Sequence, residues 1–302
     1  MNQKLHFFIG KGGVGKSTSS AISAIYLSNN KIKTLLVSID PAHNQRDLFN
    51  KDFSEKKMKI NDYLSVIEVD ESFWIKKYLA QVKKEVNETY TYQTAFNLDK
   101  YFKILKYSPG IEEYALLLAI ENVLKKNLDV EYIIFDMPPT ALTLKIFSLP
   151  LTTYVWLEEL LKLRLEIYKK KEIISKIKLG KIEIETDKVK NSLDRMIIHY
   201  SILRELFLSD KVLINIVKNP DILSLSESIR LISKIRELEM HINSIIINKY
   251  DPKISHSKHE SYKNEKVVYI KNSEKRLNGF DALSNFADTY KDVFKGLFSI
   301  ES

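Results

Sequence analysis

The sequence predicts an α/β fold: a doubly wound, mostly parallel sheet flanked by helices, with a helical subdomain formed by two insertions. Three observations support this prediction. Short apolar runs end in glycine or aspartate, a glycine-dense turn joins the first run to a helical pattern, and two long intervals separate later runs. We expect one domain over residues 1–302, because a chain that is 44% hydrophobic and 28% charged can bury one large core.

The first element is a short strand that leads into a helix. Residues 5–9 (LHFFI) are apolar, and residues 17–27 carry small and apolar side chains at helical spacing. The chain has only eight glycines, and four of them fall in the turn between these segments. The turn fits GxxxxGK[ST], the phosphate-binding P-loop. It reads Gly10, Lys11, Gly12, Gly13, Val14, Gly15, Lys16, Ser17 and Thr18.

The composition of this turn follows from its chemistry. Backbone N–H groups can wrap a phosphate only where no Cβ intrudes, and a helix N-terminus adds partial positive charge. We therefore expect all of residues 10–18 to bind the phosphates of a nucleotide. In such a loop Lys16 reaches the β- and γ-phosphates, and the Ser17 hydroxyl binds Mg²⁺.

Two further strands are expected to end in carboxylates. Residues 34–39 (TLLVSI) lead into Asp40, and residues 132–135 (YIIF) lead into Asp136. Ligands of parallel sheets bind at the carboxyl ends of the strands, where a carboxylate meets water or metal. We assign Asp136 to hold Mg²⁺ through water and Asp40 to orient the attacking water. The reverse assignment remains open.

Two intervals are too long for simple connections. A strand–helix–strand unit needs about 30 residues, yet about 90 residues separate the two aspartates and about 60 separate Pro150 from Val212. We expect helices to fill both intervals, as insertions over approximately residues 53–107 and 151–208. Most of their apolar side chains should be core, with a few left exposed as a groove. Periodicity alone does not separate these two roles.

Charge and cysteine content exclude several classes of site. The net charge is +8 and the pI about 9.2, which we interpret as a solvated basic surface, so nucleic acid is not the expected partner. The chain has no cysteine, which excludes disulfides, thiolate zinc sites and cysteine nucleophiles. With neither a signal-peptide pattern nor an apolar run near 20 residues, we expect a cytoplasmic protein.

Six strings follow one another in the order of one family's motifs. Together they resemble the family of the arsenite-pump ATPase (ArsA) and its relative that delivers tail-anchored membrane proteins. The strings are GKGGVGKST (10–18), DPAHNQRDLF (40–49), SPGIEE (108–113), DMPPTALTL (136–144), LSLSESIR (223–230) and SIIIN (244–248).

The resemblance implies a function and roles for particular residues. It implies binding and hydrolysis of ATP with Mg²⁺, and a homodimer in which Lys11, the second lysine of the deviant P-loop, reaches the partner's phosphates. Lys11, Lys16 and Asp40 would then carry catalysis, and Asn248 would contact adenine. The helical insertions would join across the dimer to hold a hydrophobic client segment or membrane-protein helix.

Departures from the family pattern leave alternatives open. The second switch carries Ala141-Leu142 where the family usually has Gly-His, and a Pro-Leu pair expected near adenine is missing from residues 267–273. An ATPase of the MinD/ParA positioning type shares GKGGVGKST and would act on membrane or DNA. A nucleotide-gated binding module with little hydrolysis is a further alternative, and so is a soluble client protein that needs a chaperone.

Overall fold

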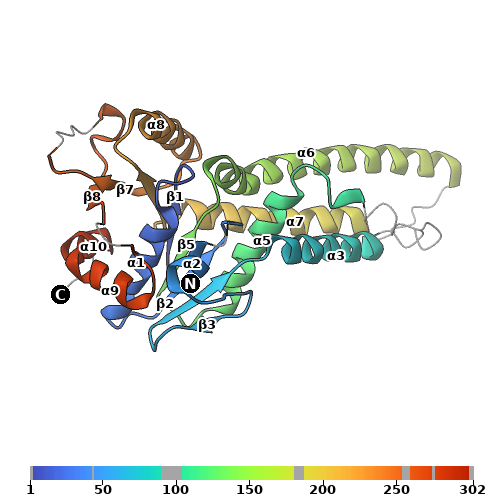
Figure 1. Cartoon of the computed structure of the whole chain (residues 1–302). Helices are drawn as coiled ribbons and strands as arrows, with labels where there is room; N and C mark the ends of the chain where they lie inside the picture. Colours follow the sequence, from blue (N-terminus) through green and yellow to red (C-terminus); the bar gives the residue numbers. More distant parts are fainter. Residues whose placement is uncertain are drawn as a thin grey trace.

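The computed structural model describes residues 3–42, 44–89, 104–179, 187–253, 259–273 and 276–298. Parts of both expected insertions, residues 90–103 and 180–186, lie outside this description, as does His43 of the DPAHNQRDLF string. The described residues form one eight-stranded sheet with helices on both faces (Figure 1). The predicted doubly wound α/β fold is therefore confirmed.

The strand order places the beginning of the chain at the centre of the sheet. The order is β3-β4-β2-β5-β1-β6-β7-β8, and only the β3–β4 pair is antiparallel. Strand β1 lies between β5 and β6, so the carboxyl ends of these three strands meet at one edge. The strands are β1 (Lys4–Ile9), β2 (Thr34–Ser38), β3 (Met58–Lys59), β4 (Leu64–Glu68), β5 (Tyr132–Asp136), β6 (Val212–Lys218), β7 (Ile242–Tyr250) and β8 (Val267–Lys271).

Helices bury the two faces of the sheet in separate apolar clusters. Helices α1, α9 and α10 cover one face, and α5, the first part of α6, the end of α7, and α8 cover the other. None of the helices in the described ranges is long and apolar enough to cross a bilayer. The helices are α1 (Lys16–Asn29), α2 (Asn44–Phe49), α3 (Glu71–Thr89), α5 (Ile111–Lys126), α6 (Thr140–Leu179), α7 (Lys188–Leu208), α8 (Ile222–Glu237), α9 (Phe280–Thr289) and α10 (Lys291–Phe298), with a 3₁₀ turn η2 at Glu260–Tyr262.

The first expected insertion, residues 53–107, does not begin as a helix. It begins with β3 and β4, and β4 extends the sheet by pairing in parallel with β2. The side-chain oxygen of Asn61 accepts the N–H groups of Tyr63 and Leu64, both at 2.8 Å, which fixes a turn immediately before β4. The buried run LSVIE is short and apolar enough to form an interior strand. Helix in this interval starts only at Glu71, so expecting helices throughout was wrong for residues 58–68.

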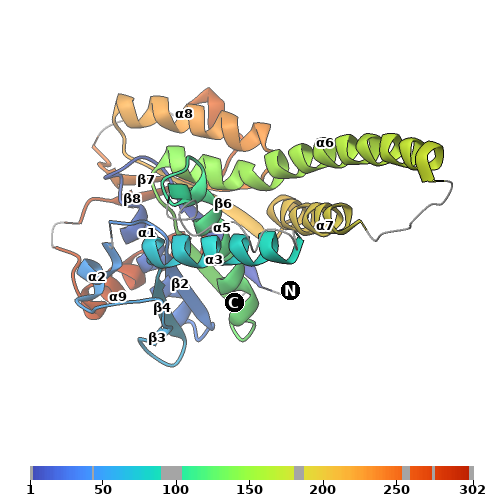
Figure 2. The same cartoon turned by 90° about the vertical axis from the view of Figure 1, so that its right-hand side faces the viewer.

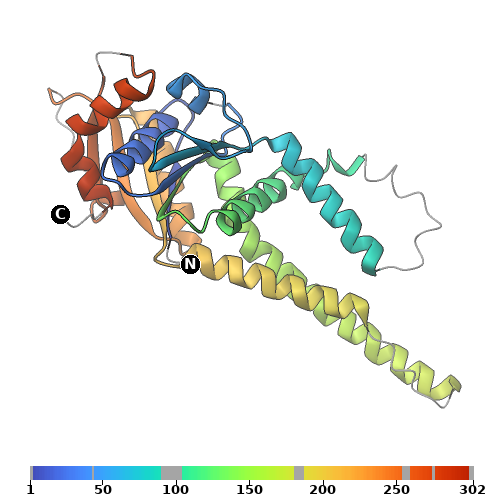
Figure 3. The same cartoon turned by 90° about the horizontal axis from the view of Figure 1, so that it is seen from below.

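Helices α3, α6 and α7 project from the sheet as an arm (Figures 1 and 3). Helix α6 starts on the sheet, where Ile146 and Phe147 are buried, and it continues through Pro150 as one 40-residue element. The expected boundary at residue 151 therefore falls inside a helix. Farther out, Arg164 on α6 donates to Asp187 at the start of α7 at 3.0 Å. This contact holds the pKa of Asp187 below its usual range.

His6 belongs to a buried polar network in the middle of the sheet. Its Nδ1 lies 3.2 Å from Asn215 Nδ2, and its ring packs 4.7 Å from that of Phe298. The side-chain oxygen of Asn215 accepts from Ser244 and Asn243 at 2.9 and 2.8 Å. Burial, with a smaller contribution from Lys4, lowers the pKa of His6 from 6.5 to about 3. Folding therefore requires a neutral imidazole.

Acid is expected to destabilise the fold through His6. Since the unfolded chain binds this proton near pH 6.5 and the folded chain only near 3, stability falls by about 1.4 kcal/mol per pH unit between these values. Asp136, with a pKa raised to about 6, acts in the opposite direction below that pH. Urea unfolding at pH 7, 6 and 5 should therefore compare the wild type with His6→Gln, which retains Asp136.

We expect the wild type to lose stability relative to His6→Gln as the pH falls. His241→Gln, at an exposed histidine, is the matched control and should follow the wild-type profile. Parallel profiles for His6→Gln and the wild type would contradict this role of His6.

Candidate functional site

The P-loop begins where β1 ends, at the carboxyl edge of the sheet. Gly15 has φ +93° immediately before α1, and a Cβ there would overlap the Asn248 amide. A Cβ at Gly10, where φ is +151°, would overlap the Val217 carbonyl of β6. Both positions therefore require glycine, because the backbone conformation is left-handed and the neighbouring atoms are close. The glycine spacing seen in the sequence builds a cradle of backbone amides at the start of α1.

A cavity of about 680 Å³ opens over this cradle. Its walls include most of the P-loop, Asp40, the first turns of α2, and the end of β7 at Asn248 and Lys249. Residues 270–273, at the end of β8, close the far side. The volume and the polar lining suit a nucleotide, with its phosphates at the helix N-terminus.

Lys16 and Asp40 meet at the edge of this cavity. Lys16 is only 5% exposed, and its Nζ lies 3.8 Å from Asp40 Oδ2 and 3.4 Å from the Lys11 carbonyl oxygen. The other Asp40 oxygen accepts the Ala42 N–H at 3.1 Å. A buried cation beside a strand-end carboxylate is suited to hold a phosphate and a polarised water together.

Asp136 lies at the bottom of the site, and its side chain is fully buried. Its Oδ2 accepts from Gln45 Nε2 at 2.9 Å, and the Ser17 hydroxyl is also hydrogen-bonded to the carboxylate. Burial raises the pKa of Asp136 to about 6, although these two hydrogen bonds and the charge of Lys16 act to lower it. Oδ1 has no hydrogen-bond partner within the described ranges. A hydroxyl and a carboxylate with an unsatisfied oxygen form a donor set that fits Mg²⁺.

Gln45 is a site residue that the sequence analysis missed. It is fully buried on α2, and Nε2 lies within 3.2 Å of the Ser17 carbonyl oxygen, Ser20 Oγ and Asp136 Oδ2. It therefore ties the segment after Asp40 to both the P-loop helix and β5. Its only mark in the sequence was its place in the DPAHNQRDLF string, where a second uncharged amide, Asn44, stands beside it.

The far end of the cavity contains Asn248 and the loop after β8, near which the family pattern has its Pro-Leu pair. Asn248 Nδ2 donates to the Val14 carbonyl at 2.8 Å, which turns Oδ1 away from the P-loop. Lys249 follows in a left-handed conformation with φ +53°. Residues 271–273 line the same space although they lack the expected Pro-Leu pair. The apolar side chains of Ile270 and Phe286 add a surface suited to a planar base.

Lys11 is separate from the other predicted residues. The structure brings Lys16, Ser17, Asp40 and Asn248 to one cavity, with Asp136 beneath Ser17. Lys11 instead extends along the surface, where its Nζ lies 3.4 Å from Glu227 Oε1 of α8. The Lys11 side chain therefore does not line the cavity of its own subunit.

This fold and site define a P-loop nucleoside triphosphate hydrolase with a deviant, two-lysine loop. The family model described as anion-transporting ATPase matches residues 3–292. The chain therefore belongs to the anion-transporting ATPase (ArsA) family and is an ATPase.

Individual relatives cover most of the chain. It is 31% identical over 250 residues to the putative arsenical pump-driving ATPase 2 of Aquifex aeolicus, covering 82% of this chain and 81% of that one. It is 29% identical over 298 residues to the ATPase ASNA1 homolog of Plasmodium berghei, covering 95% and 73%. The ASNA1 homolog of Entamoeba histolytica is 30% identical over 251 residues, with 82% and 76% covered. The resemblance inferred from the motifs is confirmed.

Proposed function

We propose that this ATPase is a homodimeric switch whose helical arm binds a hydrophobic client, for targeting of a membrane protein or for chaperoning. The observation that carries the proposal is the continuity between site and arm. Helix α6 begins at Thr140, four residues after Asp136, and runs without interruption into the arm (Figure 2). A change at the phosphate end of the site therefore acts directly on the base of a helix that lines the client groove.

The chemistry of the switch is assigned to residues of the cavity. The P-loop amides and Lys16 hold the phosphates, and Ser17 and Asp136 would hold Mg²⁺, which neutralises charge on the phosphate oxygens when bound. Asp40 orients the attacking water, and Lys11 of each subunit contacts the nucleotide of the other. Asn248 accepts a hydrogen bond from the amino group of adenine through the oxygen that faces away from Val14.

Hydrolysis is communicated by the segments that follow the two aspartates. Gln45 links α2 to Ser17 and Asp136, so a shift of the metal-holding groups moves α2 as well. Thr143, in the first turn of α6, donates to the Pro138 carbonyl at 2.7 Å, which ties the start of the helix to the loop after Asp136. Loss of the γ-phosphate would therefore shift both segments together.

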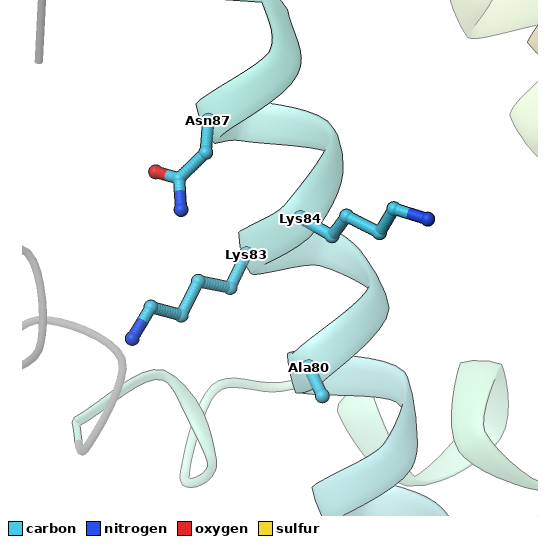
Figure 4. Close-up of a pocket in the computed structure, with 4 residues that line it drawn as sticks. All are labelled: Ala80, Lys83, Lys84 and Asn87. Carbon is cyan, nitrogen blue, oxygen red and sulfur yellow. The ribbon is translucent and has the colours of Figure 1, made fainter.

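A groove in the arm provides the surface for the client. A cavity of about 840 Å³ lies between α3, α5, α6 and α7, with apolar walls from residues such as Leu117, Trp156, Leu160 and Met196. Trp156 is 61% exposed, and further apolar side chains are exposed nearby on α6. On α3, the side chains of Lys83 and Asn87 point to one side of the helix and Lys84 points to the other (Figure 4). Exposed apolar surface of this kind is typical of protein-binding sites.

Isolating the protein with its client tests the proposal. The Asp40→Asn protein, expressed in its native cell, should retain a bound apolar peptide or membrane protein because hydrolysis no longer releases it. Asp40→Asn combined with Trp156→Asp should lose that material. Asp40→Asn with Leu128→Asp is the matched control, because Leu128 is 66% exposed but lies between α5 and β5, outside the groove. Empty preparations, or equal retention by all three proteins, would contradict client binding in the groove.

A further inference from the structure

The contact between Lys11 and Glu227 has no role in a single subunit's phosphate site. Lys11 and Glu227 side chains are 32% and 37% exposed, so both remain accessible from solvent while paired at 3.4 Å. The start of α8 is fixed independently, because Asp221 accepts the Ser224 N–H at 2.8 Å and Ser224 Oγ accepts the Asn219 N–H at 2.9 Å. Glu227 therefore contacts Lys11 from a helix whose first turn is fixed by these two hydrogen bonds.

The face of α8 that carries Glu227 also exposes apolar side chains. Leu223 lies one turn before Glu227 on the same face and is 61% exposed, and its neighbour Ile222 is 83% exposed. An adjoining face of α8 packs on the sheet through Leu231, Ile232 and Ile235. Leu223 is thus exposed to solvent beside the Lys11–Glu227 pair, at the edge of the sheet where the nucleotide binds.

We propose that the Leu223–Glu227 face of α8 is part of the ATP-dependent interface between two copies of this chain, and that Glu227 is a positioning residue for Lys11. Glu227 holds Lys11 on its own subunit until a second copy presents its bound triphosphate. Lys11 then exchanges one carboxylate for the more highly charged phosphates, while Leu223 is buried against the second copy. This inference rests on the proposed homodimer.

A second copy suits this surface because a two-fold interface must be self-complementary. Each copy offers one cation, one anion and one apolar side chain close together. Closing the dimer breaks two Lys11–Glu227 pairs, one in each subunit, so the pair opposes association. Burying Leu223 favours association. The two residues, one helical turn apart, therefore have opposite expected effects, which a general loosening of α8 would not produce.

The dissociation constant of the ATP-bound dimer, measured by analytical ultracentrifugation, tests the proposal. The measurements use Asp40→Asn as the parent, so that ATP persists. Since an exposed pair contributes about 0.2–1 kcal/mol and two pairs are broken, Glu227→Gln should tighten the dimer by about 2- to 30-fold. Leu223→Ser should weaken it by about 5-fold or more. Glu237→Gln is the control, because Glu237 pairs with Lys234 farther along α8 and should leave the constant unchanged.

A double-mutant cycle attributes the effect to Lys11. In a Lys11→Met background, Glu227→Gln should no longer change the dissociation constant. Three results would overturn the proposal. Glu227→Gln could weaken the dimer, or tighten it equally with and without Lys11. Leu223→Ser could leave the dissociation constant unchanged. If the parent protein stays monomeric with ATP, the proposed homodimer itself fails. A parent that dimerises while the variants behave alike refutes only the role of α8.

Discussion

Replacing Asp40 with asparagine is expected to stop ATP hydrolysis while ATP still binds. A positioned carboxylate that accepts a proton from water contributes about 10²- to 10⁴-fold to a rate, and the amide does not replace it. In the free protein, Asp40 Oδ2 lies 3.8 Å from the buried Lys16 ammonium and therefore competes with a phosphate for it. Removing this charge should leave ATP affinity equal or higher.

Phosphate release and ATP titration on the same preparation separate these two effects. Asp52→Asn is the control, because Asp52 also follows the first switch but lies on the surface in an ion pair with Arg46. Its turnover should match the wild type. If Asp40→Asn instead loses Mg²⁺-dependent ATP binding, the reverse assignment of the two aspartates is correct. Unchanged turnover would remove Asp40 from the mechanism.

Replacing Gly15 with alanine is expected to abolish tight ATP binding. At φ +93° an alanine costs about 1–2 kcal/mol of backbone strain, or about 5- to 30-fold in affinity if the strain is relieved by distorting the loop. The added Cβ would also displace the Asn248 amide and break its hydrogen bond to Val14. Both ends of the nucleotide site are therefore disturbed by one methyl group, which should raise the dissociation constant beyond the effect of strain alone.

Gly110→Ala is the matched control for this substitution. Gly110 has φ +90° before α5, but a Cβ there meets no atom of the described residues within 4 Å. In urea unfolding, Gly110→Ala should lose about as much stability as Gly15→Ala. Its ATP affinity, measured by calorimetry, should match that of the wild type. Similar affinities for Gly15→Ala and the wild type would mean that the loop does not grip the phosphates as proposed.

Local features of the sequence predicted the centre of the site well. The P-loop could be recognised because its glycines, Lys16 and Ser17 must stand at fixed spacing to hold a phosphate. Asp40 and Asp136 follow continuous apolar runs, and those runs form the interior strands β2 and β5. Strands that are buried on both faces of a sheet are continuously apolar, so they can be recognised in a single sequence.

Features that depend on tertiary packing could not be predicted in the same way. Strand β4 forms because the LSVIE run finds β2 beside it, and a short apolar run does not by itself separate strand from helix. Gln45 bonds Ser17, 28 positions away, and Asp136, 91 positions away. The residues next to Gln45 in the sequence do not indicate these long-range contacts. Residues 271–273 lie at the cavity because the strand order places β8 beside β7. That order cannot be seen in the local sequence.

The unbroken course of α6 also determines how large a movement the arm can make. Its 40 residues span about 60 Å at the usual rise per residue, so a tilt of only a few degrees at Thr140 carries the far end through several ångströms. Pro150 lacks an N–H and weakens the helix one quarter of the way along, which gives the rod a natural pivot. Bending at Pro150 would absorb part of a tilt that starts at Thr140, so stiffening this position should carry more of that movement to the far end of α6.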